Sequence, residues 1–208
     1  MDEIELVQAI RQGDLTAFNE LVLKYQDQVF NLARRILGNQ DLAEDVTQDT
    51  FILAFQNINQ FRGGSIRAWL LKIARNLCYD EMRTWKRHPH LPLEPTDKEN
   101  NVNESPYWIK DPGPLPEESA ETSDLRRVLE HGLNQLPLKF RIVVALVDVH
   151  QMNYKEASWI AGIPIGTMKS RLARGRMQLG SILQDTAKPY ISEPNNFNMT
   201  VTPPYQPK

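Results

Sequence analysis

The segment 165–176 carries cationic and hydroxyl side chains in a pattern suited to duplex DNA. Arginine and lysine contact phosphates and guanine edges, and serine or threonine can hydrogen-bond to either. The candidate side chains on this segment are Thr167, Lys169, Ser170, Arg171, Arg174 and Arg176. An apolar set recurs at helical spacing and is expected to face a core: Ile165, Met168, Leu172 and Leu179.

Two helices joined by a tight turn would position these side chains. Asn153 is expected to cap the first helix, with Glu156 in the capping-box position. Gly162 stands where that helix would end, and Pro164 where the next would begin. A short helix, a glycine turn and a basic helix form the layout of a helix-turn-helix that docks in the major groove. A basic helix face is often only solvated surface, but the caps and the turn favour DNA binding.

A second nucleic-acid candidate is the expected helix from Ile66 to about Lys86. Its apolar stripe comprises Ile66, Trp69, Leu70, Ile73, Leu77 and Cys78. A polar face, preceded by Arg62 in the loop, carries Lys72, Arg75, Asn76, Tyr79, Arg83 and Lys86. Cations alternating with an aromatic ring and an amide suit a single strand, with phosphates outside and unstacked bases available. Taken alone, the same charges would also fit a solvated helix.

The expected helix from residue 41 to about 58 has an acidic face that contains two large apolar residues. We expect Asp41 and Glu44 to form its capping pair. The exposed arc carries Asp41, Glu44, Asp45, Gln48, Asp49 and Gln56, with Ile52 and Phe55 among them. A solvated face is the default interpretation of the acids, but apolar residues among them are typical of a protein interface.

Charge and proline divide the chain. Residues 1–61 and 89–124 carry net charges of −6 and −7, whereas residues 62–88 and 125–188 carry +5 and +6, which the whole-chain net charge of −2 hides. Seven of the fourteen prolines lie within 88–119 and five within 188–208. We therefore predict an all-α protein with two small helical domains, of four helices and of helix-turn-helix type. The expected boundaries are 1–87, an extended acidic linker 88–121, 122–186, and a disordered tail 187–208.

Other functional classes find little support in the residues. The single cysteine, Cys78, lies in an apolar helical stripe and is expected to be a core residue. The four histidines lack zinc-site spacing, and no phosphate loop or nucleophile motif is present, so we expect neither enzymatic activity nor a metal or cofactor. No apolar signal segment or membrane-length stretch occurs, which predicts a cytoplasmic protein without membrane insertion.

Three segments together resemble a known family. DLAEDVTQDTFILAF (41–55), FRGGSIRAWLLKIARNLCYDEMR (61–83) and LPLKFRIVVALVDVHQMNYKEASWIAGIPIGTMKSRLARGR (136–176) are similar to bacterial RNA polymerase sigma factors of the sigma-70 class. Within that class the chain resembles the small extracytoplasmic-function group, which retains only the second and fourth conserved regions. The three segments follow one another in the order found in the family, which makes the resemblance far more specific than a match to a lone helix-turn-helix would be.

The resemblance implies a role for each surface. Asp45, Gln48 and Asp49 match positions that bind a coiled coil of the polymerase's largest subunit, and Ile52 lies in the same arc. A second set matches the pattern around the opened −10 promoter element: Trp69, Asn76, Asp80 and Arg83. A third set matches the helix that reads the −35 element as duplex: Lys169, Ser170, Arg171 and Arg174. Members of this group are commonly held by an anti-sigma factor, and nothing in the sequence specifies one.

Two departures from the family pattern concern local structure. The loop between Phe61 and Trp69 is slightly shorter than in typical members. Because this loop usually shapes the pocket for the captured base, the identity of that base cannot be inferred from relatives. Gly175 replaces a usual alanine, at a cost of about 1 kcal/mol in a helix interior.

The alternative to a sigma factor is a helix-turn-helix regulator that binds operators as a dimer. It would explain residues 125–184 but neither the acidic arc nor the second basic face.

Overall fold

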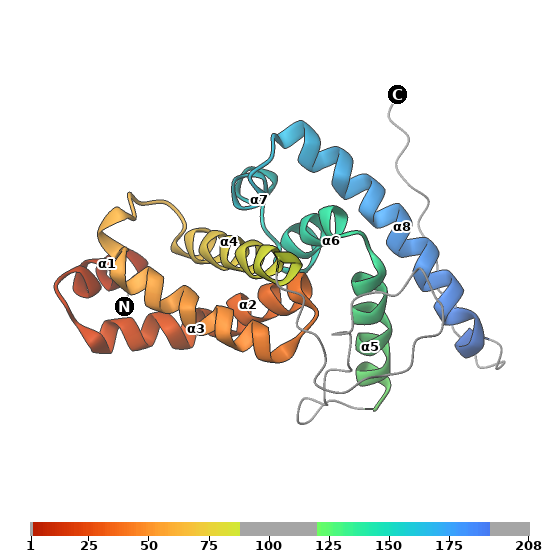
Figure 1. Ribbon diagram of the computed structural model, residues 1–208, viewed down its shortest axis with the longest axis horizontal. Coiled ribbons are helices and arrows are strands. Elements are labelled where there is room, and N and C mark those ends of the chain that lie inside the picture. Colours follow the sequence, from red (N-terminus) through yellow and green to blue (C-terminus); the bar gives the residue numbers. More distant parts are fainter. Residues whose placement is uncertain (1, 88–119, 192–208) are drawn as a thin grey trace.

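The computed structural model describes residues 2–87 and 120–191, and all regular structure in these ranges is helical (Figure 1). The all-α prediction is therefore confirmed. The elements are α1 (Glu3–Arg11), α2 (Leu15–Leu37), α3 (Gln40–Gln56), the 3-10 turn η1 (Ile58–Gln60), α4 (Ile66–Arg87), α5 (Ala120–Gln135), α6 (Leu138–Val144), the π-helical turn η2 (Ala145–Val149), α7 (Tyr154–Ala161) and α8 (Ile165–Ile191). Nearly all of the expected linker 88–121 lies outside the described residues. Helix α8 continues past residue 186, where we expected the second domain to end.

Local signals set most helix ends in the N-terminal block, residues 2–87. Asp14 caps α2 by accepting hydrogen bonds from two backbone amides of the first turn, and Gly38 ends it in a left-handed conformation (φ 71°). The expected capping pair of α3 is wrong, because Asn39 is its N-cap and accepts a hydrogen bond from the Leu42 amide at 2.9 Å. Asp41 lies instead within the first turn, where a carboxylate interacts favourably with the helix dipole.

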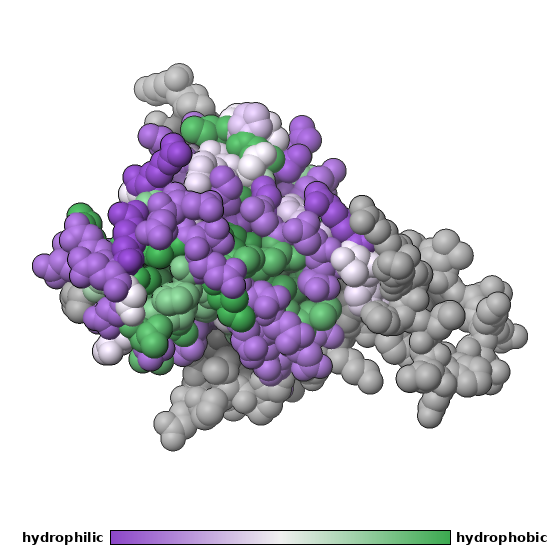
Figure 2. Space-filling view, turned by 60° about the vertical axis from the view of Figure 1, so that its left-hand side comes forward, coloured by the Kyte–Doolittle hydropathy of each residue, from purple (hydrophilic) through white to green (hydrophobic). Residues whose placement is uncertain are grey.

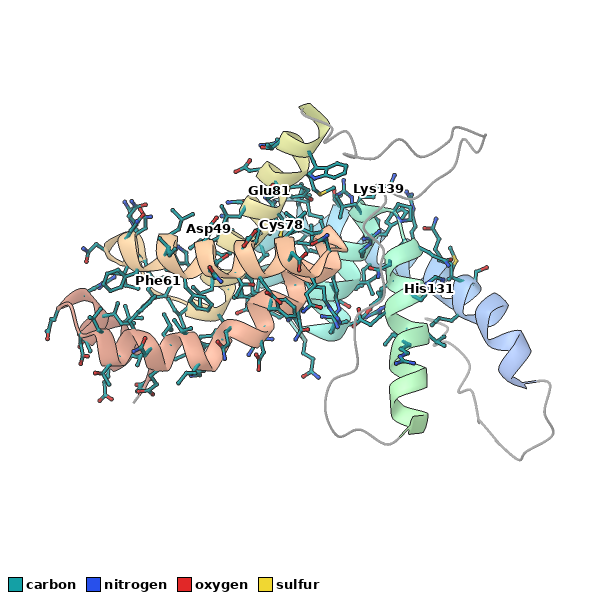
Figure 3. The ribbon with its side chains drawn as sticks, turned by 60° about the horizontal axis from the view of Figure 1, so that its bottom comes forward. Asp49, Phe61, Cys78, Glu81, His131 and Lys139 are labelled. Atoms are coloured by element: carbon teal, nitrogen blue, oxygen red, sulfur yellow. The ribbon has the colours of Figure 1, made fainter. Side chains whose placement is uncertain are left out.

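The core of this block is formed by the apolar stripes of α2, α3 and α4. Leu21, Leu32 and Leu70 are completely buried. Cys78 on α4, labelled in Figure 3, is also fully buried, as its place in the apolar stripe predicted. Burial raises the pKa of its thiol to about 12, so the sulfur stays protonated and acts as a small apolar residue.

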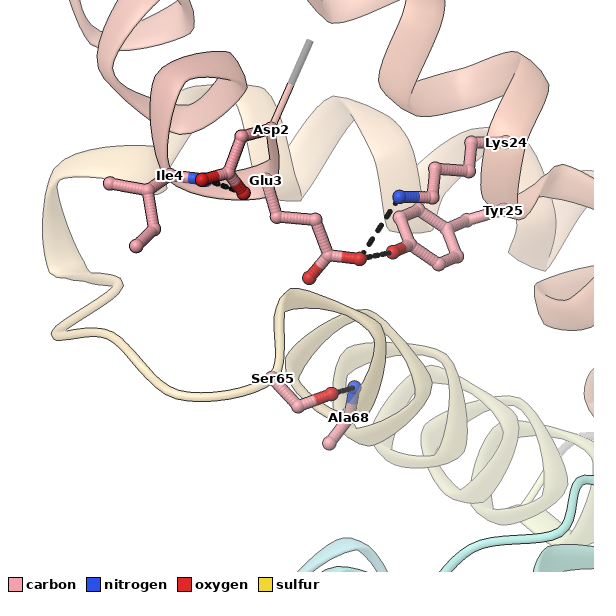
Figure 4. Close-up of polar contacts among 7 residues, drawn as sticks. All are labelled: Asp2, Glu3, Ile4, Lys24, Tyr25, Ser65 and Ala68. Carbon is pink, nitrogen blue, oxygen red and sulfur yellow. Dashed lines mark hydrogen bonds and ion pairs between the residues drawn. The ribbon is translucent and has the colours of Figure 1, made fainter.

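Helix α1 is fastened to α2 by a small polar cluster (Figure 4). The carboxylate of Glu3 accepts hydrogen bonds from the Tyr25 hydroxyl and from Lys24 Nζ, the latter at 3.0 Å. These hydrogen bonds, that from Tyr25 foremost, hold the pKa of Glu3 below its usual value. Ser65 Oγ accepts from the Ala68 amide at 3.1 Å, which starts α4 directly after the 61–65 loop.

In the C-terminal block, residues 120–191, α8 packs along both α5 and α6. The π-helical turn η2 follows α6 directly, and Gln151 then adopts a positive φ of 52°. A non-glycine residue in this region is strained, so the packing around it must hold the conformation. The chain thereby turns sharply between α6 and α7, and α7 comes to lie beside α4 of the other block (Figure 1).

Gly175 lies where α8 packs tightly against α6. A Cβ atom at this position would stand 2.8 Å from Val144 Cγ2 and 3.3 Å from Phe140 Cβ. Val144 is buried and β-branched, so its side chain has little freedom to move away. Glycine has a low helix propensity, but at this position it is needed for the packing of α8 on α6.

We expect Gly175→Ala to destabilise the protein although alanine favours helix. Overpacking costs about 2 kcal/mol and exceeds the gain in helix propensity of about 1 kcal/mol, leaving a net loss of about 1 kcal/mol. Urea unfolding would measure this change. Gly180→Ala on the same helix is the matched control, because a Cβ there meets nothing within 4 Å and should add stability. A stabilised Gly175→Ala variant would contradict the packing argument.

The two blocks pack against each other through charged as well as apolar residues. Arg35 Nη2 on α2 lies 2.5 Å from Glu130 Oε1 on α5, and both side chains are about nine-tenths buried. Arg34 lies 3.6 Å from the same carboxylate oxygen. Arg141 on α6 donates to the Arg35 carbonyl at 3.3 Å, and Arg67 on α4 donates to the His150 carbonyl.

His150 lies buried between the blocks and should make stability depend on pH. Burial, with the Arg35 and Arg67 guanidinium groups nearby, lowers its pKa from 6.5 to about 3. The unfolded chain therefore binds a proton below pH 6.5 that the folded chain does not accept. The stability contributed by neutral His150 is complete above pH 6.5 and is lost as the pH falls toward 3.

We expect the free energy of unfolding to fall between pH 7 and pH 5, by up to about 1.4 kcal/mol per pH unit below the unfolded pKa. Urea titrations at several pH values would measure this slope. His150→Gln should flatten it, since the amide does not titrate, whatever its effect on stability at pH 7. Equal slopes in the two proteins would remove His150 as the cause.

Candidate functional site

Helices α7 and α8 form the predicted helix-turn-helix. Asn153 caps α7, accepting from the Glu156 amide at 2.9 Å, and its own amide donates to the Glu156 carboxylate at 2.7 Å. Gly162 ends α7 with φ 64°, and α8 begins at Ile165. Met168 and Leu172 are buried as expected, but Ile165 is not, being 44% exposed. It is the first residue of α8, so its side chain precedes the turn that packs on the core.

The candidate −35 residues share the accessible side of α8. Lys169, Ser170 and Arg174 are exposed, and Thr167 and Arg171 are partly exposed. Arg176 is not part of this surface, because its guanidinium makes two hydrogen bonds to the Asp148 carboxylate, at 3.0 and 2.5 Å. This pairing raises the pKa of Arg176 and holds α8 against η2. Five of the six candidate side chains therefore remain available to a ligand.

The candidate polymerase-binding residues lie together on the outer side of α3. Asp45, Gln48 and Asp49 are exposed, and Asp49 is labelled in Figure 3. Ile52 is 53% exposed within the same arc. Phe55 is 36% exposed and packs against Phe18 of α2 with the two rings tilted, their centroids 4.8 Å apart. An acidic surface with an apolar centre is suited to a basic partner that also buries apolar area.

The loop before α4 combines a buried anchor with an exposed turn. Phe61 is buried and packs against Trp69, with ring centroids 5.4 Å apart, while Arg11 of α1 donates a hydrogen bond to the Phe61 carbonyl. Gly63 and Gly64 have φ values of 96° and 90°, and Arg62 is exposed. Sequence reasoning missed Arg11, because its partner lies 50 positions away.

The candidate −10 residues of α4 are divided between solvent and α7. Asn76 and Arg83 are exposed, and Arg83 forms an ion pair with Asp80 at 2.9 Å. Tyr79 is partly buried beneath Arg75, whose guanidinium carbon lies 4.9 Å from the ring centroid. Lys72 and Arg75 are partly buried where α7 crosses α4. The side chain of Lys86 lies outside the described residues.

Trp159 on α7 is the residue of this region that sequence reasoning missed. Its ring centroid lies 3.8 Å from Lys72 Nζ, and the two side chains line a cleft between α7 and the 61–65 loop. The signal available in the sequence was a tryptophan on a short helix next to the turn, and in the structure its side chain is 45% exposed. Figure 2 shows one face of the molecule, mostly hydrophilic, with apolar residues grouped in its middle.

Within the described ranges, the chain shows neither a group of side chains arranged to hold a metal ion nor a helix long and apolar enough to cross a membrane. The arrangement is instead that of charged surfaces on separate helices. A helix-turn-helix joined to a four-helix block that carries acidic and basic surfaces is typical of a DNA-binding protein that also binds another protein.

Comparison with known proteins identifies the family. The family model described as sigma-70 region 2 matches residues 21–88, and that described as sigma-70, region 4 matches residues 126–179. The ECF RNA polymerase sigma factor SigW of Bacillus subtilis (strain 168) is 34% identical over 86% of this chain and 95% of its own length. SigE of Mycolicibacterium smegmatis is 35% identical over 83% of this chain, which spans 63% of that relative. The chain belongs to the sigma-70 family, in its extracytoplasmic-function (ECF) group.

A solved structure agrees with this assignment. The sigma factor RpoE of Bartonella quintana, in complex with the anti-sigma factor NepR, matches with a TM-score of 0.61 at 27% identity, over 80% of this chain and 96% of that one. The alternative of an operator-binding dimer is not favoured, because the region 2 match covers most of the N-terminal block, which that alternative leaves unexplained.

Proposed function

We propose that this protein joins core RNA polymerase in the cytoplasm, recognises −35 and −10 promoter elements, and starts transcription of a specific set of genes. The observation that carries the proposal is the presence, on one chain of this family, of an exposed acidic arc on α3 and an exposed basic recognition helix, α8. An anti-sigma factor is a further expected partner, since the Bartonella relative forms a complex with one.

Polymerase binding is assigned to Asp45, Gln48, Asp49 and Ile52. The carboxylates of Asp45 and Asp49 would meet a basic surface of the largest subunit's coiled coil, and Ile52 would be buried at the centre of the contact. Complementary charge gives orientation and rapid association, whereas the buried apolar residue contributes to affinity. The exposure of all four side chains supports this assignment.

Recognition of the −35 element is assigned to α8, which would lie in the major groove of the duplex. Thr167, Lys169 and Ser170 occupy its first turns and suit phosphate and base-edge contacts, while Arg171 and Arg174 can reach guanine bidentately. The α7 helix would cross the backbone. These contacts require the duplex form, so they would be made before the DNA opens.

The −10 element is assigned to the 61–65 loop and the polar face of α4. Arg62, Lys72, Arg75 and Arg83 would hold phosphates, while Asn76 and Tyr79 face the bases of one separated strand. Seating an unstacked base would offset the few kcal/mol of unpairing. The protein would thereby promote strand opening by binding the separated strand that opening produces, without a covalent step.

Reconstitution with core polymerase tests the proposal. The protein should be retained by core during gel filtration, and the complex should start transcripts from a defined set of promoters that core alone does not use. Genome-wide mapping of transcript starts would give the promoter sequence. Binding of operator DNA as a dimer, with no retention by core, would refute the proposal.

A further inference from the structure

We propose that helix α1 fixes the shape of the 61–65 loop, and with it the base that this loop selects in the −10 element, through Arg11 as a positioning residue. The inference rests on the proposed assignment of the loop to the −10 element. Arg11 is the last residue of α1, and its guanidinium donates a hydrogen bond to the Phe61 carbonyl at the start of the loop. Its effect on DNA is therefore indirect and passes through the loop backbone.

The tip of the loop has little packing of its own. Gly63 and Gly64 have φ values of 96° and 90°, and a Cβ built on either would meet nothing within 4 Å. Glycine has a wider choice of backbone conformations than any other residue. Two glycines in succession, without close neighbours, do not hold one conformation by themselves. The shape of the turn therefore depends on how the two ends of the loop are fixed.

Both ends of the loop are anchored in the N-terminal block. At the far end, Ser65 Oγ accepts a hydrogen bond from the Ala68 amide at 3.1 Å, and Ile66 is buried. At the near end, the Phe61 ring is buried against Trp69, with ring centroids 5.4 Å apart. These contacts determine where the loop begins and ends, but a packed ring leaves the direction of the backbone beyond it open.

The hydrogen bond from Arg11 sets the direction in which the chain leaves Phe61. The carbonyl that it holds belongs to the planar peptide between Phe61 and Arg62. The orientation of this carbonyl therefore fixes the plane from which the glycine turn departs. The donor is a charged guanidinium, and such hydrogen bonds are stronger than those between neutral groups.

Helix α1 is a firm support for this contact. Leu6 and Ile10 of α1 are buried in the core of the N-terminal block. The carboxylate of Glu3 accepts hydrogen bonds from the Tyr25 hydroxyl and from Lys24 Nζ on α2, as Figure 4 shows. A continuous series of contacts thus leads from α2 through α1 to the start of the loop.

Arg11 also borders a space into which the loop could move. A cleft of about 620 Å³ is lined by Val7, Gln8 and Arg11 on the α1 side and by residues 61–64 on the loop side. The loop is thus not packed on α1 along its whole length, and the Arg11 hydrogen bond spans the gap. Arg11 itself is exposed, so its truncation would free the loop without leaving a hole in the core.

Backbone dynamics of the free protein test this role without DNA. In wild type, the NMR order parameters of the Gly63 and Gly64 amides should be about 0.85, and in Arg11→Ala they should fall below about 0.6. Arg11→Lys keeps a charged donor and should give intermediate values. Gln12→Ala is the matched control, because Gln12 is the next residue and is also exposed, and it should leave both values unchanged. Equal order parameters in wild type and Arg11→Ala would overturn the proposal.

Base selection by the reconstituted polymerase tests the consequence for DNA. Templates made from one mapped promoter would carry each of the four bases in turn at every position of the −10 element. Gly64→Ala identifies the position that the loop reads, because alanine is strained at a φ of 90° and the turn must change. At that position, Arg11→Ala should lower the preference for the best base, measured as a ratio of opening rates, by about tenfold.

A merely structural role of Arg11 would give a different pattern. Loss of folded protein or of core binding lowers the opening rate by the same factor on every template and leaves the ratio unchanged. Arg11→Lys should recover part of the preference, and −35 duplex binding should stay at the wild-type level in both variants. A preference that survives in Arg11→Ala would overturn the proposal and leave the sigma-factor function intact. A wild-type protein without base preference at any −10 position would instead refute the assignment of the −10 element, and this proposal with it.

Discussion

Asp45→Arg combined with Asp49→Arg is expected to abolish binding to core polymerase while leaving the fold intact. Both carboxylates lie on the exposed arc of α3, so their replacement removes no buried contact. Arginines there would face the basic coiled coil proposed as the partner, and like charges brought together across an interface cost several kcal/mol. The affinity should fall by about a hundredfold or more.

Co-purification and competition against a labelled sigma factor would measure this loss. Asp27→Arg on α2 is a control for charge reversal, because this acid is exposed but lies outside the α3 arc. Thermal unfolding should give similar midpoints for all the variants. If the folded double variant competes as well as wild type, α3 is not the polymerase surface.

Sequence patterns predicted the features of this fold that depend on neighbouring residues. Helix α7 begins after Asn153 and ends at Gly162 as expected, because a cap and a left-handed glycine act within one turn. The boundary of α3 shows the limit of such patterns, since Asn39 and Asp41 are both competent caps. Asn39 acts as the cap because Gly38, directly before it, has already turned the chain out of α2.

Contacts between the blocks had no local signal. Arg35 and Glu130 are 95 positions apart and meet only because α5 packs on α2. Gly175 is the clearest case of a misleading local signal, since helix propensity favours alanine there and the approach of Val144 disfavours it. The basic face of α4 was identified as a set from the sequence. That α7 covers part of it depends on how the two blocks pack, which no periodicity encodes.

The two proposed DNA surfaces should respond differently to single substitutions. Arg174→Ala should weaken −35-dependent binding by about 1–3 kcal/mol, the value of a bidentate base contact. Asn76→Ala should leave binding of closed duplex nearly unchanged and reduce strand opening, because bases are available to the amide only after melting. Both side chains are exposed, so neither substitution leaves a cavity in the core.

A premelted −10 bubble separates the two defects. It supplies the single strand without the free energy of unpairing, so it should partly rescue Asn76→Ala in the reconstituted polymerase. The same bubble cannot restore a base contact to −35 duplex, so Arg174→Ala should remain defective. Permanganate footprinting would report opening, and duplex binding on matched templates would report −35 recognition. Equal loss of duplex binding in both variants, with no rescue of either, would show that α4 and α8 do not divide the promoter in this way.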